Sequence, residues 1–413
     1  MAKRRVVITG IGAVTPIGSR VEGLWEGLRR ERSAVANVTR FDPSIFKSHN
    51  AAEVNDFEAT DYLEKKRAKR LDRYGHFSVA TAQMAIADAG IDLAREDRDQ
   101  IGSTMGSALG GLQFAEGQLD LYLREGIRSV DPMLALCVFG GAASCNIAIE
   151  LGITGPNSTN AMSCASGTLA IGEGMRLIRD GYADVMITGG AEAPLAPLCF
   201  GAFSIIRAMS TRNEDPSSAS RPFDKDRDGF VMGEGSAVLV LEEYERAKAR
   251  GAKIYAEIAG FGFSNDAYHM TAPRPDGSQA ARSMRLALKD ANVSPNEIQY
   301  INAHGSSTPL NDPTETKAIK DVFGDDAYRI RVSGTKGYYG HALGASGAIE
   351  AAISALAIER EWLPPTVNLN VADESCDLNF LPRTGENERV EHVLSNSFGF
   401  GGINAALVLR RVT

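Results

Sequence analysis

Apolar positions along the chain follow two periods, and together they predict an alternation of strands and helices. Short β-branched runs around Val7 and Leu239 are typical of buried strands. Ile171, Met175 and Ile178 recur at helical spacing and predict a helix that begins close to residue 164. Alternating strands and helices indicate an α/β protein whose crossover helices cover its sheets.

The second half of the chain repeats short segments of the first half in the same order. Because four such pairs occur in the same order, we predict two duplicated α/β halves, residues 1–252 and 253–413. In one pair, Cys164 and His341 would open equivalent helices and face one shared crevice. The four pairs are the glycine-broken strands 7–12 and 257–262, the helix ends 85–91 and 287–293, the helices after Cys164 and His341, and the closing strands 229–241 and 397–409.

Composition places the chain among globular proteins with a sizeable core. Of its 413 residues 44% are hydrophobic and 23% are charged, which is typical of a folded chain rather than a disordered one. The longest apolar stretch, residues 133–143, is far shorter than the ~20 residues that span a membrane. We therefore expect this stretch to be a core or interface segment.

Charge and cysteine content exclude several classes of function. The net charge of −8 argues against nucleic acid as the main partner. Five widely spaced cysteines, without a Cys-x-x-Cys pair, support neither a disulfide framework nor a zinc site. A reducing, cytoplasmic setting is the simplest expectation.

Cys164 is the strongest candidate for chemistry, because it lies where a turn of small residues meets the predicted helix. Unpaired N–H groups and the helix dipole at that end favour a thiolate, so we expect a lowered thiol pKa and a nucleophilic sulfur. The alternative is a small buried apolar residue, which is the usual role of a free cysteine.

Two histidines in glycine-flanked turns, His304 and His341, could complete a catalytic site. A thiolate can hold an acyl group while two imidazoles donate hydrogen bonds to a second carbonyl. Lys336 would add a positive charge, and Glu350 is its possible counter-charge. Alternatively, the histidines are structural hydrogen-bonding groups and the charges form a solvated ion pair.

A glycine-rich turn with two phenylalanines, Phe398 and Phe400, lies near the C-terminus. Such a turn could present an N–H group as one arm of an oxyanion hole, or it could be a β-bulge with core aromatics. The glycines do not open a helix after a first strand, so the turn is not a dinucleotide fingerprint. No nicotinamide cofactor is therefore expected.

These motifs resemble, from end to end, the thiolase-superfamily condensing enzymes, and among them the β-ketoacyl-acyl-carrier-protein synthase II group. The resemblance implies a five-layered αβαβα fold, a homodimer and no cofactor, with substrates carried on the phosphopantetheine arm of acyl carrier protein. It implies decarboxylative Claisen condensation in fatty acid elongation. The matching segments are 4–10, the cysteine motif 160–170, 221–224, 227–235, 266–273, both histidine motifs and the ending 396–404.

The resemblance also implies roles for individual residues. Cys164 would take the acyl chain, His304 and His341 would promote decarboxylation of the malonyl group, and Lys336 and Glu350 would support the histidines. Phe400 would supply an oxyanion-hole N–H and a gating ring. Substrate-binding residues would be Leu109, Thr271, Ser306, Thr308 and Phe398, and carrier docking would use Lys65, Lys66, Lys69, Arg70, Arg128 and Arg207.

The sequence departs from the family pattern at three places. Gly337, Tyr338 and Tyr339 follow Lys336 where the family commonly has Ser-Met-Thr, and Ile403 replaces a threonine beside the glycine-rich turn. Ser306 replaces a threonine in the first histidine motif and keeps the hydroxyl. A polyketide ketosynthase would share the same reacting groups. A noncatalytic chain-length-factor-like subunit would lack Cys164, and a degradative thiolase would use a second cysteine as its base.

Overall fold

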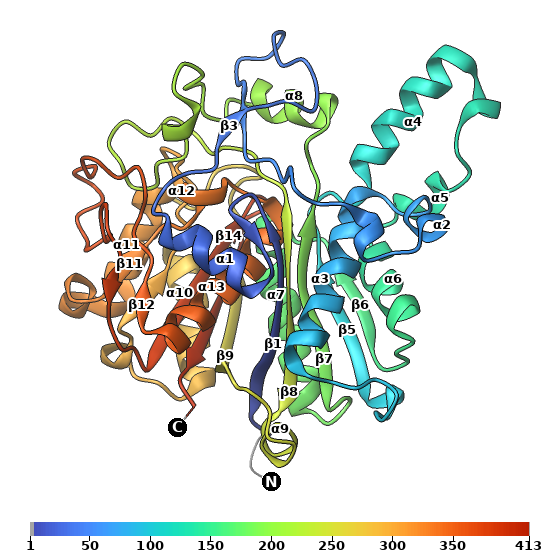
Figure 1. Ribbon diagram of the computed structural model, residues 1–413. Coiled ribbons are helices and arrows are strands. Elements are labelled where there is room, and N and C mark those ends of the chain that lie inside the picture. The colour runs from blue at the N-terminus through green and yellow to red at the C-terminus, as the bar shows by residue number, and fades with distance from the viewer. Residues whose placement is uncertain (1–3, 413) are drawn as a thin grey trace.

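The computed structural model describes residues 4–412, in which eleven strands form one sheet (Figure 1). The order across the sheet is β11-β10-β14-β15-β9-β1-β8-β7-β5-β6, and the short β2 pairs with β1. The strands are β1 (Val6–Thr15), β2 (Gly18–Ser19), β5 (Ile101–Gly106), β6 (Asn157–Asn160), β7 (Val185–Glu192), β8 (Gly235–Glu243), β9 (Ala256–Asn265), β10 (Tyr300–Asn302), β11 (Arg331–Ser333), β14 (His392–Gly399) and β15 (Ile403–Arg410).

The sheet consists of two halves with the same strand order and the same directions. The order β1-β8-β7-β5-β6 in the first half corresponds to β9-β15-β14-β10-β11 in the second. In each half the first three strands are antiparallel neighbours and the last three are parallel neighbours. The halves join where Val7 pairs with Glu257 and Ile8 with Ala256. The predicted duplication of an α/β unit is confirmed.

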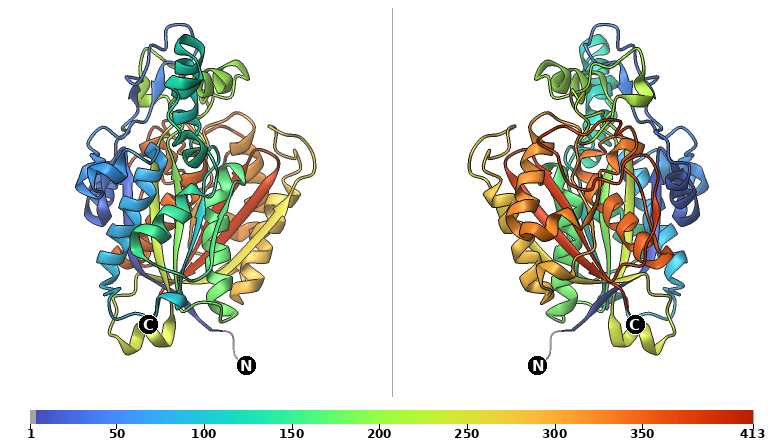
Figure 2. Two further views of the ribbon diagram at one scale, coloured as in Figure 1. Left: turned by 90° about the vertical axis from the view of Figure 1, so that its right-hand side faces the viewer. Right: turned by 90° about the vertical axis from the view of Figure 1, so that its left-hand side faces the viewer.

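Two helices, α7 (Ser166–Arg179) and α13 (Ser346–Arg360), lie between the two half-sheets, which diverge from their junction (Figure 2). Strand alternation explains this layering. In β8, Leu239 and Leu241 pack in the central layer, whereas Val238 and Val240 pack against the outer helices. The outer layers are α3 (Arg73–Ala89) with α6 (Ala142–Leu151), and α10 (Ser278–Ala291) with α11 (Asn311–Phe323). The expected five-layered αβαβα fold is confirmed.

Repeated glycines in β1 and β9 permit the outer helices to pack closely. A Cβ atom on Gly10 would lie 2.2 Å from the carbonyl oxygen of Ala85 in α3. A Cβ atom on Gly260 would lie 2.3 Å from the carbonyl oxygen of Ala287 in α10. The glycine pairs of the two predicted strands therefore have the same packing function in both halves.

The two outer helices end as the sequence predicts. The residue after α3 is Gly90, with φ of 63°, and the residue after α10 is Asn292, with φ of 53°. Both are left-handed stops, which glycine and asparagine adopt most readily.

Helix α4 (Leu112–Glu125) projects from the body of the protein and buries none of its residues (Figure 1). The apolar stretch 133–143 that follows it is partly exposed, with Leu136 at 56% and Phe139 at 46%. A core location for the whole stretch is therefore wrong, whereas an interface role stays a prediction. Within residues 4–412, no helix combines the length and apolar character needed to cross a membrane.

The remaining elements are short or connect the layers. The helices are α1 (Arg20–Arg29), α2 (Lys65–Ala68), α5 (Leu134–Cys137), α8 (Pro197–Ile205), α9 (Tyr244–Ala249) and α12 (Lys336–Tyr339), and the strands are β3 (Ala36–Asn37), β4 (Asn50–Ala51), β12 (Trp362–Leu363) and β13 (Glu386–Asn387).

Candidate active site

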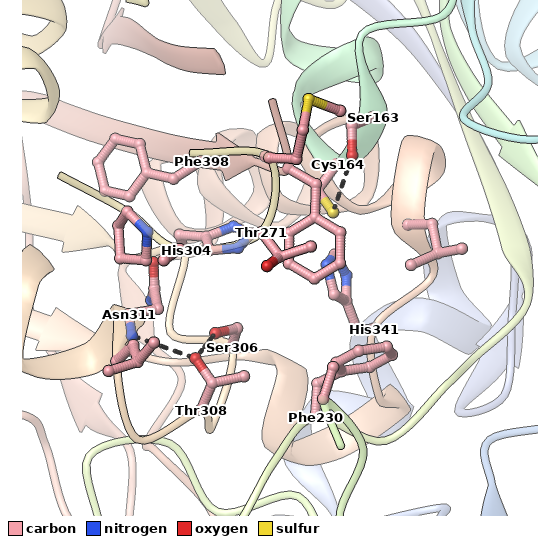
Figure 3. Close-up of a pocket in the computed structure, with 18 of the residues that line it drawn as sticks. Ser163, Cys164, Phe230, Thr271, His304, Ser306, Thr308, Asn311, His341 and Phe398 are labelled. Atoms are coloured by element: carbon pink, nitrogen blue, oxygen red, sulfur yellow. Dashed lines mark hydrogen bonds between the residues drawn. The ribbon is translucent and has the colours of Figure 1, made fainter. Parts of the chain in front are cut away.

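A cavity of about 410 Å³ collects most of the residues that the sequence singles out. Its walls come from both duplicated halves, and Figure 3 shows Cys164, His304 and His341 directed toward it. The prediction that Cys164 and His341 face a shared crevice is confirmed. The predicted site residues that line the cavity are Leu109, Cys164, Arg207, Thr271, His304, Ser306, Thr308, His341, Phe398 and Phe400.

Cys164 lies in a single 3₁₀ turn, Ser163–Ala165, immediately before α7. Ser163 has φ of 52°, a left-handed conformation that is costly for a residue with a side chain. The Ser163 hydroxyl lies 3.7 Å from the Cys164 sulfur as a hydrogen-bonding partner. The turn thus presents the sulfur to the cavity at the start of a helix, as predicted.

The expected lowering of the thiol pKa is wrong. Burial raises the pKa of Cys164, because removing the sulfur from water penalises the thiolate. The Ser163 hydroxyl, the Lys336 charge and the Phe400 N–H group act in the opposite direction without overcoming burial. The resting sulfur at neutral pH is therefore a neutral thiol.

The glycine-rich segment forms the hairpin turn between β14 and β15, beside Cys164. Gly401 and Gly402 have φ of 82° and 74°, and Gly399 pairs with Ile403 across the hairpin. A Cβ atom on Gly399 would lie 3.1 Å from the Cys164 nitrogen. Glycine at this position permits the turn to approach the nucleophile closely.

His304 follows β10, at the carboxyl end of a parallel strand in the second half-sheet. Its backbone N–H donates to Glu315 Oε1 at 2.8 Å, and the N–H of Gly305 donates to Glu315 Oε2 at 2.9 Å. Glu315 is fully buried in α11. The turn that carries the imidazole is therefore fixed from behind by one carboxylate.

Lys336 and Glu350 lie behind His304 rather than on the cavity wall. The Lys336 ammonium is buried, donates to the His304 carbonyl oxygen at 2.6 Å and forms an ion pair with Glu350. Its nitrogen is also 3.4 Å from His304 Nδ1. A donor at Nδ1 leaves the proton of the neutral ring on Nε2. The alternative of a solvated ion pair is wrong, since both side chains are buried.

His341 precedes α13 and packs against Phe230 with ring centroids 5.5 Å apart. Its Nδ1 is 2.8 Å from Ser346 Oγ, at the first residue of α13. The turn equivalent to that of Cys164 is Leu343–Ala345, in which Gly344 occupies the cysteine position. The prediction of equivalent helix starts therefore holds for Cys164 but misplaces His341 by three residues.

Both imidazoles are neutral at neutral pH. Burial lowers the pKa of each histidine well below 6.5, and the Lys336 charge lowers both further. Burial also raises the pKa of Glu350 to about 7, against the opposing effect of Lys336. The cavity therefore holds a neutral thiol and two neutral imidazoles.

The departures from the family pattern leave Lys336 in place. Tyr338 and Tyr339 are fully buried in the central layer, and the Tyr339 hydroxyl hydrogen-bonds with Thr335 Oγ1 at 2.9 Å. Ile403 packs against the same central core. Larger side chains thus fill the core beneath the site while the reacting groups keep their contacts.

The predicted docking residues are exposed but lie in separate places. Arg207 follows α8 at the cavity, whereas Lys65 and Lys66 lie on α2, away from α8 in Figure 1. Lys69 and Arg70 follow α2 directly, and Arg128 lies in the 3₁₀ turn Ile127–Ser129 beyond α4. One chain therefore does not bring the basic groups of α2 together with Arg207.

Sequence reasoning missed several residues that shape the site. Each contacts one of the predicted catalytic residues through hydrogen bonds or through a ring contact. A hydroxyl at the start of each helix, and a carboxylate eleven residues after His304, were the available signals. The missed residues are Ser163, Ser346, Glu315 and Phe230.

This fold and cavity define the class of thiolase-like condensing enzymes. Residues 3–247 match the family described as "Beta-ketoacyl synthase, N-terminal domain", and residues 255–370 match its C-terminal domain. The chain therefore belongs to the β-ketoacyl synthase family and is an enzyme, a condensing acyltransferase.

Similar proteins support this membership over the full length. A Synechocystis protein named 3-oxoacyl-[acyl-carrier-protein] synthase 2 is 48% identical, covering 100% of this chain and 99% of its own. One of the same name from Coxiella burnetii is 46% identical, covering 100% of both. A type II polyketide ketosynthase, solved with its acyl-carrier protein and bound to the hexaketide, superposes with a TM-score of 0.92 at 37% identity, covering 100% of both chains.

Proposed function

We propose that the chain is a 3-oxoacyl-acyl-carrier-protein synthase of fatty acid elongation. An acyl group carried by one carrier protein would condense with the malonyl group carried by a second one. The products would be 3-oxoacyl carrier protein, CO₂ and free carrier protein. The observation that carries the proposal is one cavity in which Cys164 faces two neutral imidazoles. Sequence identity of 42–48% over nearly the full length to proteins named 3-oxoacyl-[acyl-carrier-protein] synthase 2 supports the same reaction.

The first half-reaction transfers the acyl group to Cys164. The sulfur attacks the thioester carbonyl, the carrier sulfur leaves, and the thiol proton goes to that leaving sulfur. Backbone N–H groups of Cys164 and Phe400 would stabilise the oxyanion. The Phe400 N–H group acts to lower the pKa of the Cys164 thiol, which supports its place in this step.

The second half-reaction forms the carbon–carbon bond. The Nε2–H groups of His304 and His341 would donate to the malonyl thioester oxygen, so that the enolate is stabilised as the bond to CO₂ breaks. The electron pair of that bond becomes the enolate, whose carbon attacks the Cys164 thioester. The cysteine sulfur leaves as a thiolate and takes up one proton from solvent. Neutral imidazoles suit this task, because each keeps one N–H donor without becoming an acid.

Lys336 and Glu350 would act as positioning residues. The Lys336 ammonium donates to the carbonyl of His304 and approaches its Nδ1, and therefore keeps the remaining proton on Nε2. Glu350 balances the buried charge of Lys336.

The substrate arm and acyl chain would occupy the rest of the cavity. Ser306 Oγ and Thr308 Oγ1 are hydrogen-bonded at 2.9 Å, and both can turn toward the amides of a phosphopantetheine arm. Thr271 lies on the same wall. Leu109 and Phe398 would bound the acyl pocket, and the half-buried Phe400 ring would be its gate. No further cofactor is needed for these steps.

The carrier protein would dock on the exposed basic groups, since acyl carrier proteins are acidic. Docking on Lys65, Lys66, Lys69, Arg70, Arg128 and Arg207 requires surfaces that are separate in one chain. A similar ketosynthase is known in complex with its acyl-carrier protein, which supports a carrier as the partner of this chain.

A homodimer would cover the apolar surface near α4. Leu123 of α4 is 72% exposed, and Ile149 of α6, which lies next to strand β6, is 65% exposed. Strand β6 lies at the edge of the sheet, and a free edge strand is a ready site for pairing with another chain. We also propose a cytoplasmic location and a boundary between the two halves at residues 252 and 253, between α9 and β9.

Mass spectrometry after incubation with acyl carrier protein tests the proposal. A mass increase that maps to Cys164, followed by CO₂ release and a 3-oxoacyl product when malonyl carrier protein is added, is expected. Cys164→Ala should take up no acyl group, whereas the matched variant Cys145→Ala should behave as the wild type. Wild-type protein that takes up no acyl group would overturn the proposal.

A polyketide ketosynthase is the second candidate, because a structure of that kind superposes with a TM-score of 0.92. Carrier proteins from the two pathways, compared for condensation product, separate the candidates. A noncatalytic chain-length-factor-like subunit is disfavoured by the thiol of Cys164 in the cavity.

A further inference from the structure

Glu192, the last residue of β7, has a fully buried carboxylate that touches two cavity walls. Oε1 accepts from Ser107 Oγ at 3.0 Å and from the Leu109 N–H at 3.1 Å. Oε2 accepts from the Ala108 N–H at 2.6 Å and from the Gly344 N–H at 2.9 Å. All four donors are neutral groups.

These donors belong to two segments that are far apart in sequence. Ala108 and Leu109 line the cavity at the proposed end of the acyl pocket. Gly344 lies in the turn Leu343–Ala345, which connects His341 to α13. Because β7 is an inner strand of the sheet, its terminal carboxylate is a fixed point that joins the acyl wall to the histidine wall.

The two segments meet so closely that the junction admits no larger residue. A Cβ atom on Gly344 would lie 2.4 Å from the Ala108 nitrogen and 2.6 Å from Glu192 Oε2. Both segments also contain left-handed residues, Gly110 with φ of 57° and Leu343 with φ of 39°. Such turns persist where surrounding contacts fix them, and the carboxylate supplies those contacts.

Burying a carboxylate among neutral groups is costly, and its hydrogen bonds must offset that cost. Burial raises the pKa of Glu192 to about 7, while the donors of Ala108, Leu109 and Gly344 oppose the increase. Without the carboxylate, the backbone N–H groups of Ala108, Leu109 and Gly344 would lose their partner. A carboxylate here is therefore better explained by the turns it holds than by packing alone.

We propose that Glu192 is a positioning residue that determines which acyl chain lengths the enzyme accepts. It does so by holding Leu109, at the end of the acyl pocket, in a fixed position relative to the turn after His341. The inference rests on the proposed function, since it concerns the acyl group carried by Cys164. When the tie is broken, the Leu109 turn can move outward, and the pocket lengthens.

The test compares Glu192→Gln with the wild type, using octanoyl and palmitoyl carrier thioesters. Glutamine has nearly the same size as glutamate. However, its NH₂ group is a donor and would face N–H or O–H donors, so the hydrogen bonds that one carboxylate oxygen now accepts would be lost. The ratio of kcat/KM for palmitoyl over octanoyl transfer to Cys164 should rise about fivefold, the factor that one lost hydrogen bond typically gives. The rate of CO₂ release from malonyl carrier protein should fall as well.

A buried carboxylate remote from the acyl wall provides the matched control. Glu242 in β8 is equally buried and binds Arg250 and Thr9, so Glu242→Gln should lower thermal stability while leaving the chain-length ratio unchanged. Ser107→Ala removes only one donor and should shift the ratio in the same direction by a smaller factor.

The outcomes separate this inference from the proposed function. Wild-type protein without acyl transfer would overturn the function itself. An active wild type, with a folded Glu192→Gln variant whose ratio stays within about twofold of it, would overturn the role of Glu192. If Glu192→Gln does not fold, an unchanged ratio in Ser107→Ala would overturn the role, and a shifted ratio would support it.

Discussion

The rings of His304 and His341 lie with their centroids 5.4 Å apart and their planes at 80°. Each ring has its own partner at Nδ1, Lys336 for one and Ser346 for the other. The Lys336 ammonium can only donate, so it keeps the proton of the neutral His304 ring on Nε2, whereas the Ser346 hydroxyl can donate to His341 or accept from it. Two neutral imidazoles with different partners therefore face the same cavity.

Breaking the Lys336–Glu350 pair from one side should strongly destabilise the protein. Lys336→Met leaves the Glu350 carboxylate buried without its counter-charge, which typically costs about 3–5 kcal/mol. Denaturant unfolding should show that loss. The double variant Lys336→Met/Glu350→Leu should recover part of it, because no uncompensated charge stays buried. A single variant as stable as the wild type would contradict the pair.

The pH dependence of stability should report the buried histidines. In the unfolded chain an imidazole titrates near 6.5, whereas burial lowers the folded pKa of His341 well below that value. As the pH falls below 6.5 the unfolded state gains a proton that the folded state lacks, so stability is lost. The slope is up to about 1.36 kcal/mol per pH unit for each imidazole.

The variant His341→Asn isolates this contribution. Glu192 and Glu350, whose pKa values are raised by burial, have the opposite effect on the pH dependence of stability. Their effect is the same in both proteins and cancels when the stability of the variant is subtracted from that of the wild type. The stability of the wild type relative to the variant should fall from pH 7 toward pH 5, as measured by chemical denaturation. A difference that stays constant over this interval would mean that the folded imidazole titrates normally.

Two glycines, one in a packed strand and one in an exposed helix, should respond oppositely to alanine. Gly10→Ala places a Cβ atom 2.2 Å from a helix carbonyl, so a loss of about 3 kcal/mol is expected, the upper end for overpacking. Gly117, within α4, has open space around its Cβ position. Gly117→Ala should raise the stability by about 0.5–1 kcal/mol through helix propensity. Thermal unfolding of both variants measures these changes.

Charge reversal on α2 tests the docking surface. The double variant Lys65→Glu/Lys69→Glu should raise KM for carrier-bound substrate about tenfold at low salt and less at high salt, since exposed charges are screened. A short acyl thioester that lacks the carrier should react unchanged. Lys289→Glu, on the exposed face of α10, is the matched control and should leave both values unaltered. Equal effects on both substrates would contradict docking at α2.

Sequence patterns were sufficient to predict the features that repeat along the chain and the residues at which helices end. The sequence itself contains the glycine pairs of β1 and β9 and the left-handed helix stops, Gly90 and Asn292. The duplicated fold was predicted from these repeats. Cys164, His304 and His341 are visible for a similar reason, because each lies in a short turn of small residues between periodic segments.

Features that depend on burial and on distant contacts could not be predicted. The pKa of Cys164 is raised because the sulfur is desolvated, and no local pattern reports desolvation. Glu315 and Glu192 join segments through hydrogen bonds that only the folded chain creates. Likewise, the exposure of Leu136 and Phe139 depends on the projection of α4 from the body.

The final strand of the sheet, β15, lies between β14 and β9 rather than at an edge. The turn that carries Phe400 directly precedes β15, so the position of this turn beside Cys164 depends on the pairing of β15 with both of its neighbours. Insertion of one strand between β14 and β9 therefore completes the second half-sheet and closes the cavity beside the sulfur in the same folding step.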